Sequence, residues 1–309
     1  MHEHQIHVTS GEHVLVGSLL LPEGEGLFPA VLLVPGSGPV NRDSDHPRAR
    51  LGITRQFAHA LAQAGVASLR YDKRGVGAST GDFKSTGLHE NADDAGAALA
   101  ALSARPEVAA SAVFLLGHSE GALLAAAVAA RGRPVAGVVL ISCSAAPGEE
   151  VLRWQAAQIA ASLPPGVRVL LRLLRTDLVR QVRKNHDRIR ATTTDTARIG
   201  LVRLNARWTR EFMAHDPRED LARIHAPVLA VTGGFDLQVD PAHAEVIAVT
   251  VAGPAEAHVV PGVSHVLRSQ SGRPSLNSYG KDVRRPVDSR VLGLVTDWVT
   301  RHSGSAVDG

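Results

Sequence analysis

The amino-acid sequence predicts an α/β fold in which a mostly parallel sheet is flanked by helices. Short apolar runs, rich in β-branched residues and leucine, recur along the 309 residues, and each ends at a glycine or a polar turn. Such runs are typical of strands that are buried on both faces. Segments with helical hydrophobic spacing lie between the runs, and this alternation favours parallel strands joined by right-handed crossovers.

Seven apolar runs make up the predicted sheet. They cover residues 13–22, 29–36, 65–72, 112–119, 135–142, 227–234 and 257–262. Five helical patterns make up the predicted layers beside the sheet. They cover residues 54–64, 91–104, 120–131, about 242–251 and 287–302. The histidine-containing residues 1–7 are expected to be a frayed end, because no further metal ligands accompany them.

Residues 149–220 interrupt the alternation of strands and helices. The segment contains no convincing strand, and leucines and valines recur at helical spacing within 151–163 and 167–183. We therefore expect a helical insertion at 149–220, with residues 1–148 and 221–309 forming the core. The arginines of the insertion could attract an anionic part of a substrate, but a solvated helix face accounts for them more simply.

The composition excludes several classes of protein. The formal charge is only +3 and the arginines are scattered among acidic residues, so nucleic acid is not an expected partner. No stretch offers the roughly 18 uninterrupted apolar residues of a membrane span, and the first ten residues lack the apolar region of a signal peptide. The single cysteine, Cys143, excludes an internal disulfide and is expected in the core. We expect a cytoplasmic protein, and its oligomeric state is left open.

A catalytic nucleophile is indicated by a G-x-S-x-G motif formed by Gly117, Ser119 and Gly121. The motif lies where a predicted strand ends and a predicted helix begins, which is the context it requires. Glycines are needed because the serine backbone is strained and a neighbouring Cβ would clash. A structural serine that caps the helix is the alternative interpretation.

A serine nucleophile needs a base, and the base needs a group that orients it. Asp236 follows the predicted strand at 227–234, and His265 follows the one at 257–262. Both therefore lie at carboxyl ends of strands, where sites in open parallel sheets are built. The chain order Ser, Asp, His is the order expected of this architecture.

Rival candidates for the acid and the base have simpler interpretations. Asp240 precedes Pro241 and is expected to cap the helix that begins there. His118 is adjacent to the serine, so its side chain would point away from it. His258 lies inside a predicted strand.

An oxyanion hole is expected in the glycine-rich loop PGSGPVNRD, residues 35–43. Backbone N–H donors aimed at the tetrahedral alkoxide of acyl transfer lower the barrier. We expect the N–H groups of Ser37 and Glu120 to supply them, since Pro35 has no N–H. A plain loop rich in turn-forming residues is the alternative.

Together these residues resemble the α/β-hydrolase superfamily over nearly the whole chain. The resemblance is closest to small bacterial serine carboxylesterases, with serine aminopeptidase-like hydrolases as near relatives. It is carried by GSGPVNRD, RYDKRGVGAST and GHSEGALLAA, and by GGFDLQVDP and GVSHVLR, which are similar to the acid and base loops of the group. One departure is Pro35-Gly36, where many relatives have His-Gly.

The resemblance implies that Ser119 is the nucleophile, Asp236 the orienting acid and His265 the base. It also implies that residues 149–220 are a lid over the acyl pocket and that no cofactor or metal is needed. Neighbouring charges are given structural roles: Asp72 is expected to pair with Arg74 across a turn. Glu120 is expected to form a salt bridge below the oxyanion loop, with Arg42 as a candidate partner.

The predicted function is hydrolysis of small-molecule carboxylic esters through an acyl-enzyme. A thioesterase acting on acyl-CoA or other thioesters is the nearest alternative, because the arginines of the insertion could face a nucleotide. A peptidase is less well supported, because nothing in the sequence indicates a pocket for a charged amino terminus. A non-catalytic ligand-binding homologue is a further alternative, against which the presence of all three triad residues counts.

Overall fold

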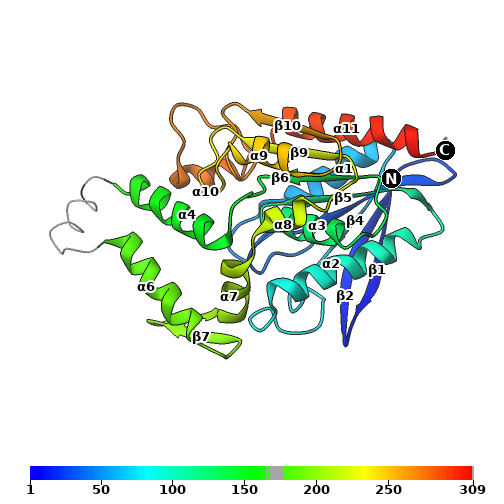
Figure 1. Cartoon of the computed structure of the whole chain (residues 1–309). Helices are drawn as coiled ribbons and strands as arrows, with labels where there is room; N and C mark the ends of the chain where they lie inside the picture. Colours follow the sequence, from blue (N-terminus) through cyan, green and yellow to red (C-terminus); the bar gives the residue numbers. More distant parts are fainter. Residues whose placement is uncertain (165, 167–176, 308–309) are drawn as a thin grey trace.

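The computed structural model describes residues 1–164, 166 and 177–307, in which an eight-stranded sheet carries helices on both faces (Figure 1). In spatial order the strands are β1 (His2–Ser10), β2 (His13–Leu21), β4 (Ala67–Tyr71), β3 (Phe28–Val34), β5 (Val108–His118), β6 (Gly137–Ile141), β9 (Val228–Gly233) and β10 (Ala255–Val260). The pairs β1–β2 and β2–β4 are antiparallel, and the other neighbouring strands of this sheet are parallel. The predicted α/β fold is confirmed, and each of the seven predicted strands is present.

The first strand, β1, shows that the expectation of a frayed N-terminal end was wrong. It pairs with β2 along its whole length, from His2 opposite Leu21 to Ser10 opposite His13. Most of its residues are exposed, because it is an edge strand. An exposed edge strand carries no apolar run, so the pattern that predicted the other strands is missing here.

The five predicted helices are present as α1 (Ile53–Gln63), α2 (Leu88–Ser103), α3 (Glu120–Ala130), α9 (His243–Thr250) and α11 (Ser289–Val307). Helices α2, α3 and α9 pack against one face of the sheet, and α1 and α11 against the other (Figure 1). Side chains alternate along each strand, so Leu32 of β3 lies in the first core and Leu33 in the second. The short η1 (Leu276–Ser278) and α10 (Tyr279–Asp282) precede α11.

The segment 149–220 adds no strand to the main sheet within the part of it that the structure describes. Its elements are α4 (Gly148–Ser162), α6 (Leu178–Arg190), β7 (Thr196–Ile199), β8 (Val202–Asn205), α7 (Ala206–Ala214) and α8 (Pro217–Leu221). Figure 1 shows α4, α6 and β7 to the left of the sheet. Residues 167–176 of the predicted helical pattern lie outside the described residues.

The pair β7–β8 shows that the expectation of no strand in this segment was wrong. The two strands form an antiparallel hairpin whose turn contains Gly200 at φ 61°. Each strand has four residues, none of them buried. A short, exposed hairpin lacks the continuous apolar run from which the other strands were predicted.

None of the helices in residues 1–164, 166 and 177–307 has the length and apolar character needed to cross a bilayer.

The loop after β4 is held by ion pairs to other parts of the chain. Asp72 binds Arg42 of the loop after β3, with 2.7 Å between Oδ2 and Nη2, and also accepts the N–H of Ala78. Arg74 binds Asp94 of α2 at 2.7 Å. The expected pair between Asp72 and Arg74 was therefore wrong, because the turn directs the two side chains toward different elements.

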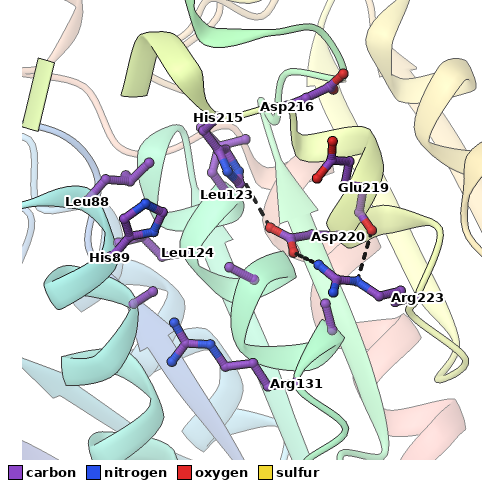
Figure 2. A pocket seen from close by; sticks show the side chains of 13 residues that line it. Leu88, His89, Leu123, Leu124, Arg131, His215, Asp216, Glu219, Asp220 and Arg223 are labelled. Carbon is purple, nitrogen blue, oxygen red and sulfur yellow. Dashed lines mark hydrogen bonds and ion pairs between the residues drawn. The ribbon is translucent and has the colours of Figure 1, made fainter. Parts of the chain in front are cut away.

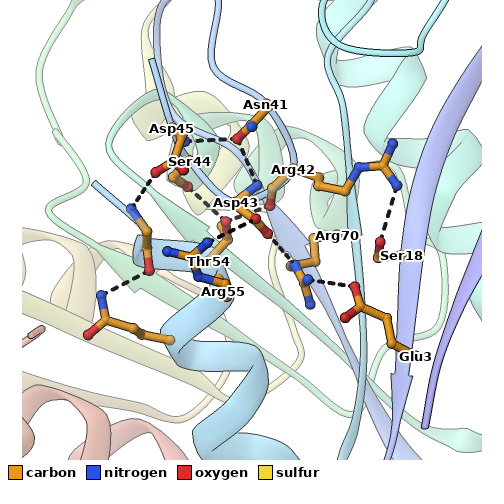
Figure 3. Close-up of polar contacts among 12 residues, drawn as sticks. Glu3, Ser18, Asn41, Arg42, Asp43, Ser44, Asp45, Thr54, Arg55 and Arg70 are labelled. Atoms are coloured by element: carbon orange, nitrogen blue, oxygen red, sulfur yellow. Dashed lines mark hydrogen bonds and ion pairs between the residues drawn. The ribbon is translucent and has the colours of Figure 1, made fainter. Parts of the chain in front are cut away.

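The loop after β3 is anchored on its other side as well. Figure 3 shows Arg42 donating to Ser18 of β2 at 3.1 Å. It also shows the buried Arg70 of β4 between Asp43 at 2.9 Å and Glu3 of β1 at 2.7 Å. The loop that contains Ser37 is thus fixed to β2 and β4 through the charged side chains of Arg42, Asp43 and Arg70.

A buried ion pair between Lys73 and Glu120 connects the loop after β4 to the start of α3. The Nζ atom of Lys73 lies 3.1 Å from Oε1 of Glu120 and 3.2 Å from the carbonyl oxygen of Gly36. Both side chains are almost completely buried. Glu120 does form the expected salt bridge below the loop, but its partner is Lys73, and the suggested partner Arg42 is occupied by Asp72.

His118, the last residue of β5, ties the loop after β10 to the same region. Burial, together with the neighbouring His265, lowers the pKa of its ring to about 3. The neutral ring donates from Nε2 to the carbonyl oxygen of His265 at 2.8 Å. A protonated His118 would be a buried charge without a carboxylate partner within hydrogen-bond distance among the described residues.

The buried ion pair predicts a large effect of Lys73→Met on stability. The substitution leaves the Glu120 carboxylate buried without its cation, which costs about 3–5 kcal/mol. Urea denaturation should show this loss in the free energy of unfolding. The double variant Lys73→Met/Glu120→Gln removes the uncompensated charge and should be more stable than the single variant. Equal stability of Lys73→Met and the wild type would contradict this description.

The low pKa of His118 predicts a loss of stability in mild acid. Below its ordinary pKa of 6.5 the ring takes up a proton in the unfolded chain, but in the folded chain it does so only near pH 3. The free energy of unfolding therefore falls as the pH drops below 6.5, by about 2 kcal/mol at pH 5 from this residue alone.

The variant His118→Asn isolates this contribution, because its amide can still donate to the carbonyl oxygen of His265. Urea denaturation at pH 7 and pH 5 should show about 2 kcal/mol less acid sensitivity in the variant than in the wild type. An equal decline in both proteins would mean that His118 does not carry the effect.

Candidate active site

Ser119 occupies a sharp turn between β5 and α3. Its backbone is at φ 59° and ψ −124°, a conformation that residues other than glycine rarely adopt. A Cβ on Gly117 would lie 2.0 Å from the carbonyl oxygen of Gly121, and one on Gly121 would lie 2.2 Å from that of Val34. The backbone thus passes so close to its neighbours that only glycine fits on either side of the serine.

The structure brings Ser119, His265 and Asp236 together at the carboxyl ends of β5, β10 and β9. Nε2 of His265 lies 3.1 Å from Oγ of Ser119, and Nδ1 lies 2.8 Å from Oδ2 of Asp236. An ionised carboxylate only accepts, so Nδ1 carries the proton and Nε2 is free to accept from the serine hydroxyl. The imidazole therefore bridges the alcohol and the carboxylate.

Asp236 is ionised in this environment. Burial alone would raise its pKa, but His265 and two backbone N–H groups outweigh burial and lower the pKa below its ordinary value. The two N–H groups belong to Gln238 and Val239 and donate to Oδ1 at 2.8 and 2.9 Å. One carboxylate oxygen is thus held by the backbone while the other binds the imidazole.

The rival residues have other contacts. Asp240 accepts the N–H of Ala242 at 3.0 Å in the turn that leads into α9. His118 faces the backbone of His265, as described above, and His258 lies in β10 near Glu256. None of these contacts reaches the hydroxyl of Ser119.

The two residues expected to form the oxyanion hole lie beside Ser119. Ser37 and Glu120 both line the cavity that contains Ser119. Within residues 1–164, 166 and 177–307, the backbone N–H groups of Ser37 and Glu120 donate no hydrogen bond to another protein atom. Both N–H groups are therefore available to an acceptor from outside the protein.

Two cavities meet at Ser119. The first, of about 80 Å³, is walled in part by Val151 and Leu152 of α4 and by Trp208 and Phe212 of α7. These two aromatic rings are stacked with their centroids 4.9 Å apart. The second cavity, of about 200 Å³, is lined by His265 and by the loop after β3. The segment 149–220 thus forms a wall of the first cavity.

A larger cavity, of about 360 Å³, lies elsewhere, between α2, α3 and α8 (Figure 2). Three of its polar side chains contact one another: Asp220 binds Arg223 at 2.6 Å and lies 3.5 Å from His215. Neither Ser119 nor His265 lines it. We therefore place the candidate active site at the two smaller cavities.

Sequence reasoning missed two residues of this region. Asp72 and Arg74 were given roles from the sequence but Lys73 was not, although a lysine directly after a buried strand indicates a buried ion pair. Ser142 follows β6 as Ser119 follows β5, and it lines the first cavity.

In the parts of the chain that can be described, no group of three or more potential ligands is arranged to hold a metal ion.

The chain is similar in sequence and in fold to several known proteins. The chain is 29% identical over 294 residues to esterase EstD of Thermotoga maritima. The matched region covers 93% of this chain and 66% of EstD. The chain thus spans about two thirds of the length of that protein. The fold is shared with Est1E of Butyrivibrio proteoclasticus, solved with ferulic acid, at a TM-score of 0.63, 18% identity and coverage of 98% of this chain and 100% of that one.

A second similar structure is the α/β-hydrolase GrgF of a Penicillium species, at a TM-score of 0.65 and 17% identity, with coverage of 98% of this chain and 100% of that one. Among sequence families, the profile of the serine aminopeptidase S33 family matches residues 49–269, which is more than half of the chain. The protein is an α/β-hydrolase and belongs to the serine aminopeptidase S33 family.

Proposed function

We propose that the protein is a serine hydrolase that cleaves carboxylic esters through an acyl-enzyme. The observation that carries this proposal is the chain of hydrogen bonds from Ser119 through His265 to Asp236, at 3.1 and 2.8 Å. A serine hydroxyl is a weak nucleophile unless a base is directed at it and a third group orients that base. The similarity to EstD, which is named an esterase, supports an ester as the substrate. A complete set of these groups argues against a non-catalytic binding protein.

The reaction begins when Oγ of Ser119 attacks the acyl carbon and Nε2 of His265 takes the hydroxyl proton. The tetrahedral intermediate collapses when His265 returns this proton to the leaving alcohol, and Ser119 keeps the acyl group. A water molecule, deprotonated by the same imidazole, then releases the acid. Asp236 keeps the imidazole in the required tautomer and stabilises its protonated form throughout.

The negative oxygen of the tetrahedral intermediate is stabilised by the N–H groups of Ser37 and Glu120. Each such donor contributes about 3 kcal/mol to lowering the barrier. Glu120 is the first residue of α3, so the positive end of the helix dipole supports the same charge. The buried Lys73 pairs with Glu120 and binds the carbonyl oxygen of Gly36. It therefore holds the N–H groups of Ser37 and Glu120 in position relative to one another.

The two cavities at Ser119 receive the two halves of the ester. The leaving alcohol must take its proton from His265, so it occupies the cavity of about 200 Å³ that His265 lines. The acyl group occupies the cavity of about 80 Å³, which we call the acyl cavity. Residues 149–220 supply part of its wall and act as a lid, and residues 1–148 and 221–309 form the core.

Three arginines of the lid pair with carboxylates of the protein, so these three are not free to bind the phosphates of a coenzyme A thioester. Arg190 pairs with Glu149, Arg207 with Glu211, and Arg218 with Asp216. These contacts use three of the lid arginines within the protein. We therefore assign carboxylic esters to the site.

The variant Ser119→Ala tests the proposed function. It removes the nucleophile, and kcat on p-nitrophenyl esters should fall by at least about 10⁴-fold. A fluorophosphonate probe should label the wild type at one site and leave the variant unlabelled. The matched control is Ser103→Ala on α2, whose hydroxyl only binds the carbonyl oxygen of Leu99.

The control variant should keep the activity and the labelling of the wild type. Undiminished turnover in Ser119→Ala, or a fluorophosphonate label that persists in it, would refute the assignment of the nucleophile.

A further inference from the structure

Ser142 is a second serine at the edge of the sheet that holds Ser119. It follows the last residue of β6 directly, and its backbone N–H donates to the carbonyl oxygen of Val231 in β9 at 2.8 Å. On the other side, the N–H of Ser119 donates to the carbonyl oxygen of Ile141 at 2.9 Å. The backbones of the two serines are therefore fixed relative to one another by the neighbouring strands.

The hydroxyl of Ser142 has no hydrogen-bond partner among the described residues, although the residue is fully buried. Two other buried serines have partners. Ser79 donates to the carbonyl oxygen of Asp72 at 2.8 Å, and Ser10 donates to Asp94. An unpaired buried hydroxyl is unfavourable, because it has given up its hydrogen bonds to water.

The backbone of Ser142 is also strained, with φ at 48°. Strained residues that are not glycine tend to occur at functional sites, where the surrounding structure holds them in place. Ser142 therefore combines an unfavourable backbone conformation with an unpaired hydroxyl.

Ser142 lines the acyl cavity together with Ser119. The remaining wall is mixed, with apolar side chains from α4 and α7 and polar residues such as Ser144 and Gln155. An aliphatic acyl chain would leave the hydroxyl of Ser142 without a partner. A hydroxyl or keto oxygen on the acyl chain would supply that partner. The cavity volume of about 80 Å³ restricts the acyl group to a short one.

We propose that Ser142 determines specificity for short carboxylic esters whose acyl chain carries a hydroxyl or keto oxygen. The hydroxyl of Ser142 donates a hydrogen bond to that oxygen or accepts one from it, and thereby places the carbonyl carbon beside Oγ of Ser119. This inference rests on the proposed function, because the cavity is an acyl site only if Ser119 forms the acyl-enzyme.

The test compares kcat/KM for ethyl 3-hydroxybutyrate and ethyl butyrate in the wild type and in Ser142→Ala. Ethyl pyruvate and ethyl propionate provide the corresponding keto pair. An electron-withdrawing oxygen speeds ester hydrolysis by itself, so the readout is the change in each ratio between proteins. We expect Ser142→Ala to lower at least one ratio by about tenfold, as the loss of one hydrogen bond to the substrate would.

Ser68→Ala is the matched control. Ser68 lies in β4, its hydroxyl is likewise buried and unpaired among the described residues, and it does not line the acyl cavity. Its ratios should equal those of the wild type. Neither variant should have a lower Tm than the wild type, because neither hydroxyl makes a hydrogen bond within the described protein.

Unchanged ratios in Ser142→Ala, in a protein whose ester hydrolysis depends on Ser119, would overturn the inference and leave the proposed function in place. A Tm several degrees lower in Ser142→Ala than in Ser68→Ala would give the hydroxyl a structural role and also overturn it. Ester hydrolysis that survives Ser119→Ala would overturn both proposals together.

Discussion

The hydrogen bond between Nδ1 of His265 and the carboxylate of Asp236 is the interaction on which the rest of the site depends. It fixes the proton on one ring nitrogen, and only then can the other nitrogen accept from Ser119. The bond is buried, and the backbone N–H groups of Gln238 and Val239 hold the carboxylate so that it stays ionised. The proposed chemistry follows from this one orientation, since a ring with the opposite tautomer would present a donor to the serine and could not take its proton.

This orientation needs three loops to stay in place, and buried polar contacts between the loops provide that constraint. Lys73 joins the loop after β4 to Glu120 and to the backbone of Gly36, and His118 joins the end of β5 to the backbone of His265. Such contacts are costly when one partner is lost, because the other is left buried and unpaired. Buried polar groups at this edge of the sheet lower the stability of the fold, but they fix the geometry of the site before a substrate binds.

The parts of the site that could be predicted from the sequence are those that depend on strand ends. Ser119, Asp236 and His265 each follow an apolar run of the sequence. Because parallel strands end at one edge of the sheet, these three residues could be expected to lie close together. The ion pair of Lys73 with Glu120 could not, because it depends on how side chains turn in two loops that no periodic pattern describes. The strand β1 and the hairpin β7–β8 were missed for a related reason: most of their residues are not buried, so they lack the continuous apolar run from which the other strands were predicted.

The central claim is that Ser119 and His265 act as one unit in catalysis. The most direct measurement is the residual kcat on one ester for Ser119→Ala, His265→Ala and the double variant, because groups that act together give strongly non-additive losses. The account predicts that the double variant is no slower than Ser119→Ala alone. A double variant whose loss equals the product of the two single losses would show that the residues act independently and would contradict it.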